Sequence, residues 1–291
     1  MSSVLYKNSK NVKYPCLNFP KNPLICAPKP RSSTRFASRN PPKPARIDTL
    51  VLTVNVNFAE RAHNHNWKLD PIVRSLLDTD FYKLLMLQFI WKNFPKTQVT
   101  SEIHNRTARI RLADRISASA LHEQMEHVRT LRLRRSELVW LAGNTFYGVK
   151  QIFHPDFLAW LDRDFHLSDY EITEHDGQLS IRFSGLWTEV TMWEVYSLAI
   201  VSEMKTRAAL ATLNELELDV LYARAKTRLW DKIELLRPIE GLRLSDFGTR
   251  RRHSFLWQEY CVQALATALN TNKSERFTGT SNTALAYKHD L

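Results

Sequence analysis

The sequence has few of the residues that mark specialised classes of protein. Its 291 residues include only three cysteines, Cys16, Cys26 and Cys261, and no two of them are spaced as a metal-binding or redox motif. We therefore expect no disulfide scaffold and no zinc site, and a reducing, cytoplasmic location. The sequence also lacks any apolar run of about 18 residues, so we expect neither a transmembrane helix nor a membrane partner.

Acidic residues are missing from the first 47 positions, and this absence explains the net charge of +11. The segment holds ten lysines and arginines, whereas the remaining residues carry 31 basic and 30 acidic side chains. A protein that follows the phosphates of a nucleic acid needs its positive charge on a folded face or a helix. The basicity here belongs to a tail, so we expect no nucleic-acid partner.

The first 60 residues also contain no glycine, and eight of the twelve prolines lie before residue 48. Such a segment buries too little apolar surface to offset its ordering entropy, which predicts a basic, proline-rich, disordered tail over residues 1–60. Two other interpretations are a transit-like peptide and a basic arm that binds polyanions. The prolines would break an amphipathic transit helix, and we favour a third interpretation, a translation start near residues 55–60.

From about residue 66 the apolar residues repeat with the periods of regular secondary structure. The spacing predicts helices at 79–93 (with Asp78 or Thr79 as N-cap), 116–130, 136–142, 191–212, 220–236 and 254–270. Strands are expected at 99–103, 108–112, 242–246, and in a hairpin of 170–175 and 178–184 around Asp176-Gly177, a type I′ turn signal. The strand, loop and helix after residue 242, followed by a turn and a new helix at 277–282, are typical of the start of a βα barrel. The chain is therefore expected to be an α/β protein.

The segment Asp246-Phe247-Gly248-Thr249-Arg250-Arg251-Arg252, at the end of a predicted strand, contains the most informative chemistry. A glycine beside an aromatic residue lets a flat ligand approach the backbone closely, and the aromatic ring offers a stacking face. Guanidinium groups supply forked donors for a carboxylate or a phosphate. The segment therefore predicts a ring platform beside an anion clamp. The alternative is an arginine cluster that caps the next helix or makes ion pairs.

Two other segments have weaker signals. Gly279-Thr280-Ser281-Asn282 could bind a phosphate or a ribose hydroxyl through its backbone N–H groups, or could be an ordinary helix N-cap. Asp78-Thr79-Asp80-Phe81-Tyr82-Lys83 places an aromatic residue and a cation in the first turn of a helix, which is also typical of core packing. No histidines have metal-ligand spacing, and no dinucleotide, Walker or Ser-His-Asp motif is present, so no metal site is expected.

Together these segments resemble the nicotinate phosphoribosyltransferases, in particular their proteobacterial branch. The motifs stand in the family order: Leu76–Leu84, Trp193-Glu194-Val195 with Ser202-Glu203-Met204, Asp246–Arg252, and Gly279–Asn282. The resemblance covers about residues 65–291. It implies an α/β N-terminal domain over 61–200 and the beginning of an irregular, incomplete βα barrel over 201–291, the type II phosphoribosyltransferase fold. Tyr196 stands where the family pattern has proline.

The resemblance also implies an activity and a substrate-binding site. The family forms nicotinate mononucleotide from nicotinate and phosphoribosyl pyrophosphate with ATP hydrolysis and Mg²⁺, a step of NAD salvage, and its active sites form across a homodimer. Phe247 resembles the aromatic residue that stacks on the pyridine ring, and Tyr82 resembles the tyrosine that covers the opposite face from the other subunit. Arg250 resembles the arginine near the pyridine substituent and the phosphates, and Thr280 and Ser281 lie where the family lines the ribose pocket.

The residues present do not include the family's catalytic histidine. That histidine becomes phosphorylated and lies in a Gly-Thr-x-Ala-His-Glu segment, which we expect beyond Leu291; His289 does not match the motif. We therefore expect these 291 residues alone to be inactive. An alternative is a non-catalytic truncated product that dimerises with a full-length enzyme, and a further one is a polyanion-binding protein that acts through the tail. Quinolinate or nicotinamide as the base is another possibility within the enzyme class.

Overall fold

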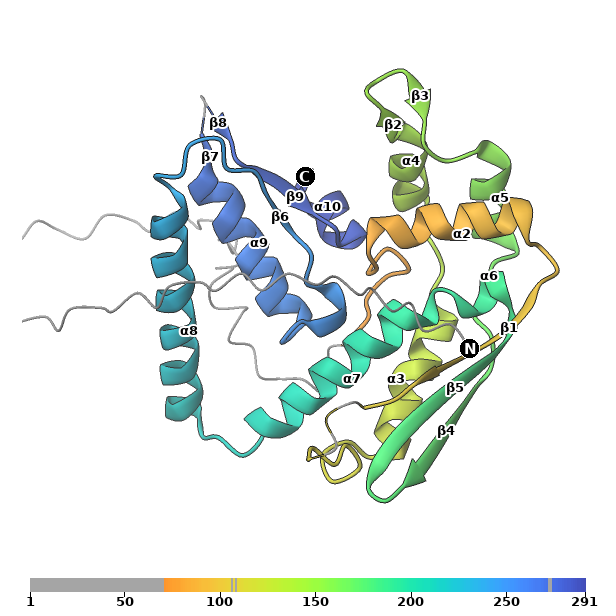
Figure 1. Ribbon diagram of the computed structural model, residues 1–291, viewed down its shortest axis with the longest axis horizontal. Coiled ribbons are helices and arrows are strands. Elements are labelled where there is room, and N and C mark those ends of the chain that lie inside the picture. The colour runs from red at the N-terminus through yellow and green to blue at the C-terminus, as the bar shows by residue number, and fades with distance from the viewer. Residues whose placement is uncertain (1–70, 106, 108, 272–273) are drawn as a thin grey trace, which may run out of the picture. The chain divides into compact units, whose positions relative to one another are not determined.

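The computed structural model describes residues 71–105, 107, 109–271 and 274–291, which all belong to one compact unit (Figure 1). The predicted tail at 1–60 lies outside the described residues. The helices are α2 (Phe81–Asn93), α3 (Ala118–Thr130), α4 (Arg135–Gly143), α5 (Pro155–Arg163), α6 (Trp187–Val190), α7 (Trp193–Leu210), α8 (Glu215–Leu236), the 3₁₀ turn η1 (Thr249–Arg251), α9 (Phe255–Leu269) and α10 (Thr283–His289). The strands are β1 (Gln98–Ile103), β2 (Thr145–Phe146), β3 (Lys150–Gln151), β4 (Tyr170–His175), β5 (Gln178–Leu186), β6 (Leu244–Asp246), β7 (Asn270–Thr271), β8 (Ser274–Glu275) and β9 (Phe277–Thr280).

An antiparallel sheet in the order β1-β5-β4 forms one side of the N-terminal part. The expected turn between β4 and β5 is confirmed, because Asp176 and Gly177 have φ angles of 51° and 73°, as a type I′ turn requires. In β5 every second side chain is buried, among them Ile181 and Phe183. The Phe183 ring stacks on Trp193 at the start of α7, with 5.2 Å between ring centroids. The alternation of β5 thus attaches the sheet to α7.

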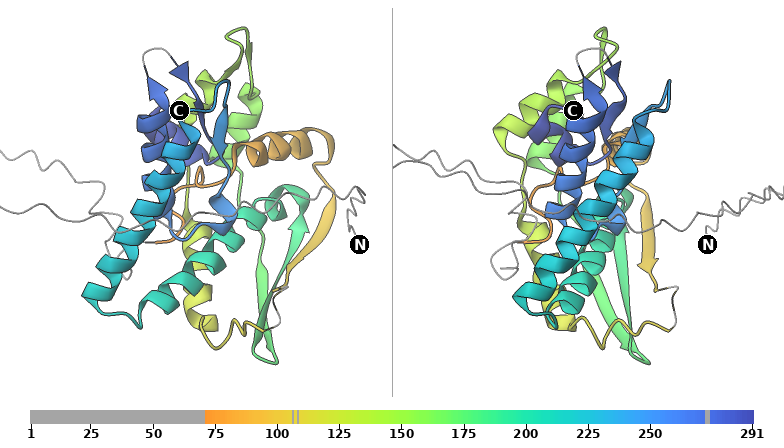
Figure 2. Two further views of the ribbon diagram at one scale, coloured as in Figure 1. Left: turned by 60° about the vertical axis from the view of Figure 1, so that its left-hand side comes forward. Right: turned by 90° about the vertical axis from the view of Figure 1, so that its left-hand side faces the viewer.

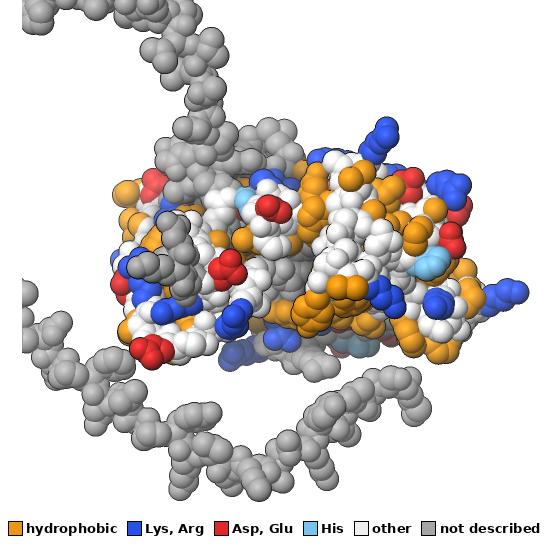
Figure 3. All heavy atoms as spheres, turned by 90° about the horizontal axis from the view of Figure 1, so that it is seen from above, with side chains coloured by type: hydrophobic (Ala, Val, Ile, Leu, Met, Phe, Trp, Pro, Cys, Tyr) orange, Lys and Arg blue, Asp and Glu red, His pale blue; other side chains and the backbone are white. Residues whose placement is uncertain are grey.

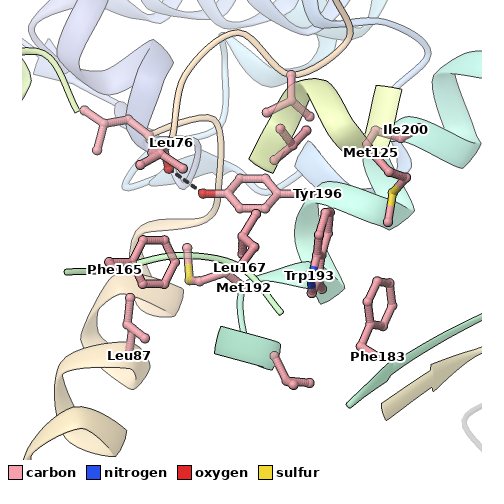
Figure 4. Packing of buried hydrophobic residues seen from close by; sticks show 14 of the residues in the cluster. Leu76, Leu87, Met125, Phe165, Leu167, Phe183, Met192, Trp193, Tyr196 and Ile200 are labelled. Carbon is pink, nitrogen blue, oxygen red and sulfur yellow. Dashed lines mark hydrogen bonds between the residues drawn. The ribbon is translucent and has the colours of Figure 1, made fainter. Parts of the chain in front are cut away.

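Helix α7 is the central element of the larger hydrophobic core (Figure 4). Trp193, Tyr196 and Ile200 are fully buried on it. The Tyr196 hydroxyl donates a hydrogen bond of 2.6 Å to the carbonyl of Leu76, in the segment that leads into α2. The residue that replaces the expected proline therefore fixes the approach to α2. A domain boundary is expected at residue 200, and α7 runs continuously across that position. The boundary stays a prediction.

The C-terminal part is a single βα unit with a second, smaller core. Strands β6 and β9 pair in parallel, and α9 connects them and lies beside both (Figure 2). The core between α8, α9 and β9 is formed by large apolar side chains such as Ile233, Phe255, Val262 and Phe277. The chain is thus a mixed α/β protein, with an N-terminal domain followed by a partial α/β region. None of the helices in the described part is long and apolar enough to cross a membrane.

Several expected elements need correction. The strand expected at 108–112 is wrong: residues 109–112 form turns and bends, and the Ile110 carbonyl accepts from the side chains of Asn105 and Gln178 instead of from a neighbouring strand. The helix expected at 79–93 begins two residues later, at Phe81. The helix expected at 220–236 begins earlier, at Glu215, because Asn214 and Glu217 form a capping box.

Several elements were not expected at all, among them a helix and a hairpin between residues 145 and 163. Helix α5 begins with Pro155 in its first turn and is capped by the side chain of His154. The short hairpin of β2 and β3 depends on Tyr147 and Gly148, which both have positive φ. Both features lie in a stretch where short polar and aromatic segments mask the helical and strand periods.

Candidate functional site

The candidate site lies at the carboxyl edge of the parallel pair β6 and β9. Asp246 ends β6, and its side chain accepts hydrogen bonds from Gln258 of α9 (2.8 Å) and from the Thr280 hydroxyl at the end of β9 (2.7 Å). The Ser281 amide donates to the Asp246 carbonyl at 2.8 Å. Because the carboxyl ends of parallel strands meet at one edge, the loop 247–252 and the Gly279–Asn282 turn lie side by side.

The beginning of α2 docks onto the same edge. The Phe81 amide donates to the Ser281 carbonyl at 2.7 Å, and the Ser281 hydroxyl donates to the buried Asp80 carboxylate at 2.7 Å. These bonds bring Tyr82 against Phe247, with 5.9 Å between ring centroids and 15° between ring planes. Phe247 is 61% exposed. The structure therefore has a pair of nearly parallel rings, open to solvent, formed by residues 165 positions apart.

Four charged side chains beside the two rings are joined by ion pairs; this charged set consists of Asp80, Lys83, Glu194 and Arg250. Glu194, in the first turn of α7, accepts from Lys83 (2.5 Å) with one oxygen and from Arg250 (2.8 Å) with the other. Arg250 also lies 3.7 Å from Asp80. Burial raises the pKa of Glu194, but the hydrogen bonds and charges of Lys83 and Arg250 outweigh that effect, and the net shift is downward. Glu194 is therefore a carboxylate that holds both cations.

The three consecutive arginines have three different environments. Arg250 makes the ion pairs described above. Arg251 is exposed, and its side chain has no hydrogen bond or ion pair with any residue that the structure describes. Arg252 is buried and binds Asp78 with two nitrogens, at 2.6 and 2.9 Å, while its Nε lies 3.4 Å from Glu203. The sequence allowed either an anion clamp or an arginine cluster that makes ion pairs, and Arg250 and Arg252 make ion pairs within the protein.

Burial also affects the ring pair. It raises the pKa of the Tyr82 hydroxyl, the negative charge of Glu194 raises it further, and the positive charge of Arg250 offsets part of the rise. Tyr82 is therefore a neutral phenol at physiological pH, with its ring available for stacking. A neutral aromatic pair beside a charged set suits a flat heterocycle with an anionic substituent.

Two small cavities open next to the rings. One, of about 240 Å³, is lined by Leu198, Phe247, Gly248, Arg250 and Arg251. The other, of about 260 Å³, shares Leu198 and both arginines and extends between α7 and the segment after β1. A larger cavity of about 950 Å³ lies between α2 and the β2–β3 hairpin, and none of the predicted site residues lines it.

The structure brings the five residues predicted to bind substrate to one place: Tyr82, Phe247, Arg250, Thr280 and Ser281. The hydroxyls of Thr280 and Ser281 donate within the protein, to Asp246 and Asp80, so they reach a ligand only as acceptors or by exchanging partners. Tyr82 faces Phe247 of its own chain, whereas the resemblance implies a tyrosine from the other subunit. Substrate binding by these residues stays a prediction.

Three residues of the site had no expected role: Asp80, Lys83 and Glu194. Asp80 is the N-cap of α2 and Lys83 lies in the first turn of that helix; their spacing in the sequence is compatible with ordinary helix packing. Glu194 is an acidic residue within an otherwise apolar and aromatic stretch, which is a signal for a paired buried charge. Within the described residues, no group of three or more histidine, cysteine, aspartate or glutamate side chains could hold a metal ion.

The parallel βα edge, the aromatic pair and the charged set together form the candidate site of a mixed α/β protein. Residues 77–202 match the model of the nicotinate phosphoribosyltransferase (NAPRTase) N-terminal domain, and residues 242–291 match that of the nicotinate phosphoribosyltransferase (NAPRTase) family. The two regions together make up more than half of the chain. The chain belongs to the nicotinate phosphoribosyltransferase family.

Solved structures support the same assignment. The nicotinate phosphoribosyltransferase from Vibrio cholerae is 30% identical with a TM-score of 0.60, and the match covers 76% of this chain and 50% of that one. The enzyme from Porphyromonas gingivalis is 27% identical (TM-score 0.61; 76% and 52% covered). A putative nicotinate phosphoribosyltransferase from Saccharomyces cerevisiae is also 27% identical (TM-score 0.61; 76% and 53% covered). The chain thus spans about half the length of these relatives.

Proposed function

We propose that the protein forms nicotinate mononucleotide from nicotinate and phosphoribosyl pyrophosphate, coupled to the hydrolysis of ATP in NAD salvage. The observation that supports this most directly is the pair of parallel rings, Tyr82 and Phe247, beside the charged set at the β6–β9 edge. A pyridine ring is flat and aromatic, and nicotinate carries a carboxylate that needs a cationic partner.

The proposed reaction displaces pyrophosphate from C1 of the ribose by the ring nitrogen. Because its transition state has oxocarbenium character, the protein contributes mainly positioning and electrostatic stabilisation. Phe247 supplies a stacking face and Arg250 a fixed positive charge beside it. Mg²⁺ would enter with the phosphates of its substrates, which carry the oxygen ligands that this ion prefers.

An enzyme assay tests this proposal. The protein, in a form that includes the segment expected beyond Leu291, is incubated with nicotinate, phosphoribosyl pyrophosphate, ATP and Mg²⁺, and nicotinate mononucleotide is measured by chromatography. Phe247→Ala is expected to raise KM for nicotinate at least about tenfold, since it removes one stacking face. Absence of product with the unchanged protein, or equal kinetics for the variant, would refute the assignment.

For a polypeptide of only these 291 residues we propose base binding without turnover, because the phosphorylated histidine is expected outside it. Product formation by the purified 291-residue chain would contradict this. The non-catalytic alternative, pairing with a longer copy, has one supporting observation: large hydrophobic side chains are exposed on α2 and the β2–β3 hairpin, including Phe89 (59%) and Val149 (89%). Hydrophobic patches are visible on the face that carries these elements (Figure 3). Co-purification with the longer copy would favour the alternative.

We also propose that the enzyme is a homodimer, and the position of Tyr82 makes a sharp test possible. Tyr82→Ala and Phe247→Ala are each expected to raise KM for nicotinate at least about tenfold, so that at a nicotinate concentration far below that KM each variant alone has at most about a tenth of the activity. If Tyr82 acts on the partner's base, mixed dimers of the two variants contain one intact site, and random mixing restores about a quarter of the activity. If Tyr82 acts within its own chain, as the 5.9 Å ring contact favours, mixing restores none.

A further inference from the structure

The charges beside the ring pair balance without any ligand. Asp80 and Glu194 contribute two negative charges, and Lys83 and Arg250 contribute two positive charges. The guanidinium of Arg250 donates to Glu194 at 2.8 Å and lies 3.7 Å from Asp80, so two carboxylates already offset its positive charge. Arg250 is therefore suited to holding the platform together, and further cations would strengthen the binding of a highly charged anion.

Two unpaired cations lie next to this set. Arg251 follows Arg250 in η1, and Lys205 projects from α7; neither side chain makes a hydrogen bond or ion pair with any of the described residues. Both line the 260 Å³ cavity. Arg251 also lines the 240 Å³ cavity that Phe247 lines, so the two cavities share a wall formed by Leu198, Arg250 and Arg251.

The lining of the two cavities favours an anion. None of the described residues that line them is aspartate or glutamate. Part of the lining is apolar, from α7 and the sheet (Ile103, Leu179, Ile181, Leu198 and Val201), and His104, Asn105, Thr107 and Ser202 add polar residues. Apolar walls lower the local dielectric and strengthen attraction between cations and an anion. An arginine fork with a lysine suits a phosphate group, and two unpaired positive charges match a doubly charged one.

We propose that Arg251 and Lys205 form a binding site for a phosphate group on a ligand whose ring or sugar lies at Phe247. The kind of ligand follows from the proposed function: it is a sugar phosphate, a pyrophosphate or a nucleoside triphosphate. Arg250 and Glu194 act as positioning residues beside it. The two cations come from η1 and α7, which are held together by the buried Arg252–Glu203 contact and by the Ser202–Arg252 hydrogen bond.

The test measures binding without turnover. The 291-residue chain is titrated at low ionic strength by calorimetry with three probes: inorganic pyrophosphate, ribose 5-phosphate and ATP. Arg251→Gln and Lys205→Ala are each expected to weaken binding of the best probe about tenfold or more, because each removes charge-assisted hydrogen bonds. Arg251→Lys, which keeps the charge and loses the fork, is expected to lie between Arg251→Gln and the unchanged chain.

Matched controls are available on the surface. Arg115→Gln and Lys96→Ala change exposed cations outside both cavities, and they are expected to bind like the unchanged chain. Urea midpoints of all variants confirm that each one is folded. The ranking of the three probes separates the sources of the phosphate: tight pyrophosphate binding with weak ribose 5-phosphate binding indicates a diphosphate or triphosphate group.

Two results would overturn the site. One is that Arg251→Gln and Lys205→Ala bind the probe with the same affinity as the control variants, and the other is that the unchanged chain binds none of the three probes. Neither depends on enzyme activity. A chain that binds pyrophosphate through these residues while the longer protein makes no nicotinate mononucleotide would retain the anion site and refute the proposed function. If the longer protein makes nicotinate mononucleotide and Arg251→Gln does not change pyrophosphate binding, the proposed function is retained and the anion site is refuted.

Discussion

The buried pair of Asp78 and Arg252 leads to a quantitative prediction about stability. Asp78 precedes α2 and Arg252 follows η1, and their side chains are 0% and 1% exposed. Arg252 donates to both Asp78 oxygens, and Asn282 donates to one of them at 2.9 Å. The substitution Asp78→Ala removes all three bonds. It leaves the guanidinium with only the Glu203 carboxylate, 3.4 Å from its Nε, and the Ile72 carbonyl.

The expected cost is large because a charge stays buried without its main partner. Removing one member of a buried ion pair lowers the free energy of unfolding by about 3–5 kcal/mol. For comparison, Glu234→Ala breaks an ion pair with Arg237 of similar length, 2.9 Å, whose side chains are 61% and 52% exposed. An exposed pair contributes about 0–1 kcal/mol. We therefore expect Asp78→Ala to be at least about 2 kcal/mol more destabilising than Glu234→Ala.

Urea unfolding of the 291-residue chain, followed by tryptophan fluorescence, measures the difference. Asp78→Asn keeps the shape and one acceptor, so it is expected to lose less stability than Asp78→Ala and gives a value if the alanine variant does not fold. The double variant Asp78→Ala with Arg252→Met removes both charges and is expected to recover part of the loss. If Asp78→Ala costs no more than Glu234→Ala, the reasoning about the buried charge is wrong.

Three further predictions concern one buried group, Tyr196, and two half-buried ones, His253 and Cys261. Tyr196→Phe leaves the buried Leu76 carbonyl without its donor and is expected to lower the free energy of unfolding by about 1–3 kcal/mol in the same urea assay. Burial lowers the pKa of His253 below 6.5, so below that pH the unfolded chain binds more protons than the folded chain. The free energy of unfolding is therefore expected to fall as the pH drops from 7.5 to 5.5, and to fall less in His253→Gln. Burial raises the pKa of Cys261 to about 12, so mass spectrometry is expected to show iodoacetamide labelling of this thiol at pH 8 at least about a hundredfold slower in the folded than in the urea-unfolded chain; equal rates would contradict its burial.

Several parts of the fold follow from local sequence patterns. The β4–β5 hairpin was predicted because Asp176-Gly177 favours positive φ at both central positions, and the structure has that turn. The helix expected over 116–130 is present, but it begins two residues later, at Ala118, after the serine cap Ser117. The expected strand at 108–112 was wrong because alternation alone cannot show whether a partner strand is present. Its carbonyl at Ile110 is satisfied by side chains.

The sequence by itself indicated which residues lie together at the candidate site: an aromatic residue followed by glycine and arginines, in a motif order found in one family. It could not divide the roles of the three arginines, since adjacent residues of the same type are indistinguishable in composition and charge. Only the tertiary structure placed Glu194 of α7 between Lys83 and Arg250, buried Arg252 against Asp78, and left Arg251 without a partner among the described residues. Those differences depend on contacts between residues 56 to 174 positions apart, which the packing of α7 against η1 and the segment before α2 decides and no local pattern encodes.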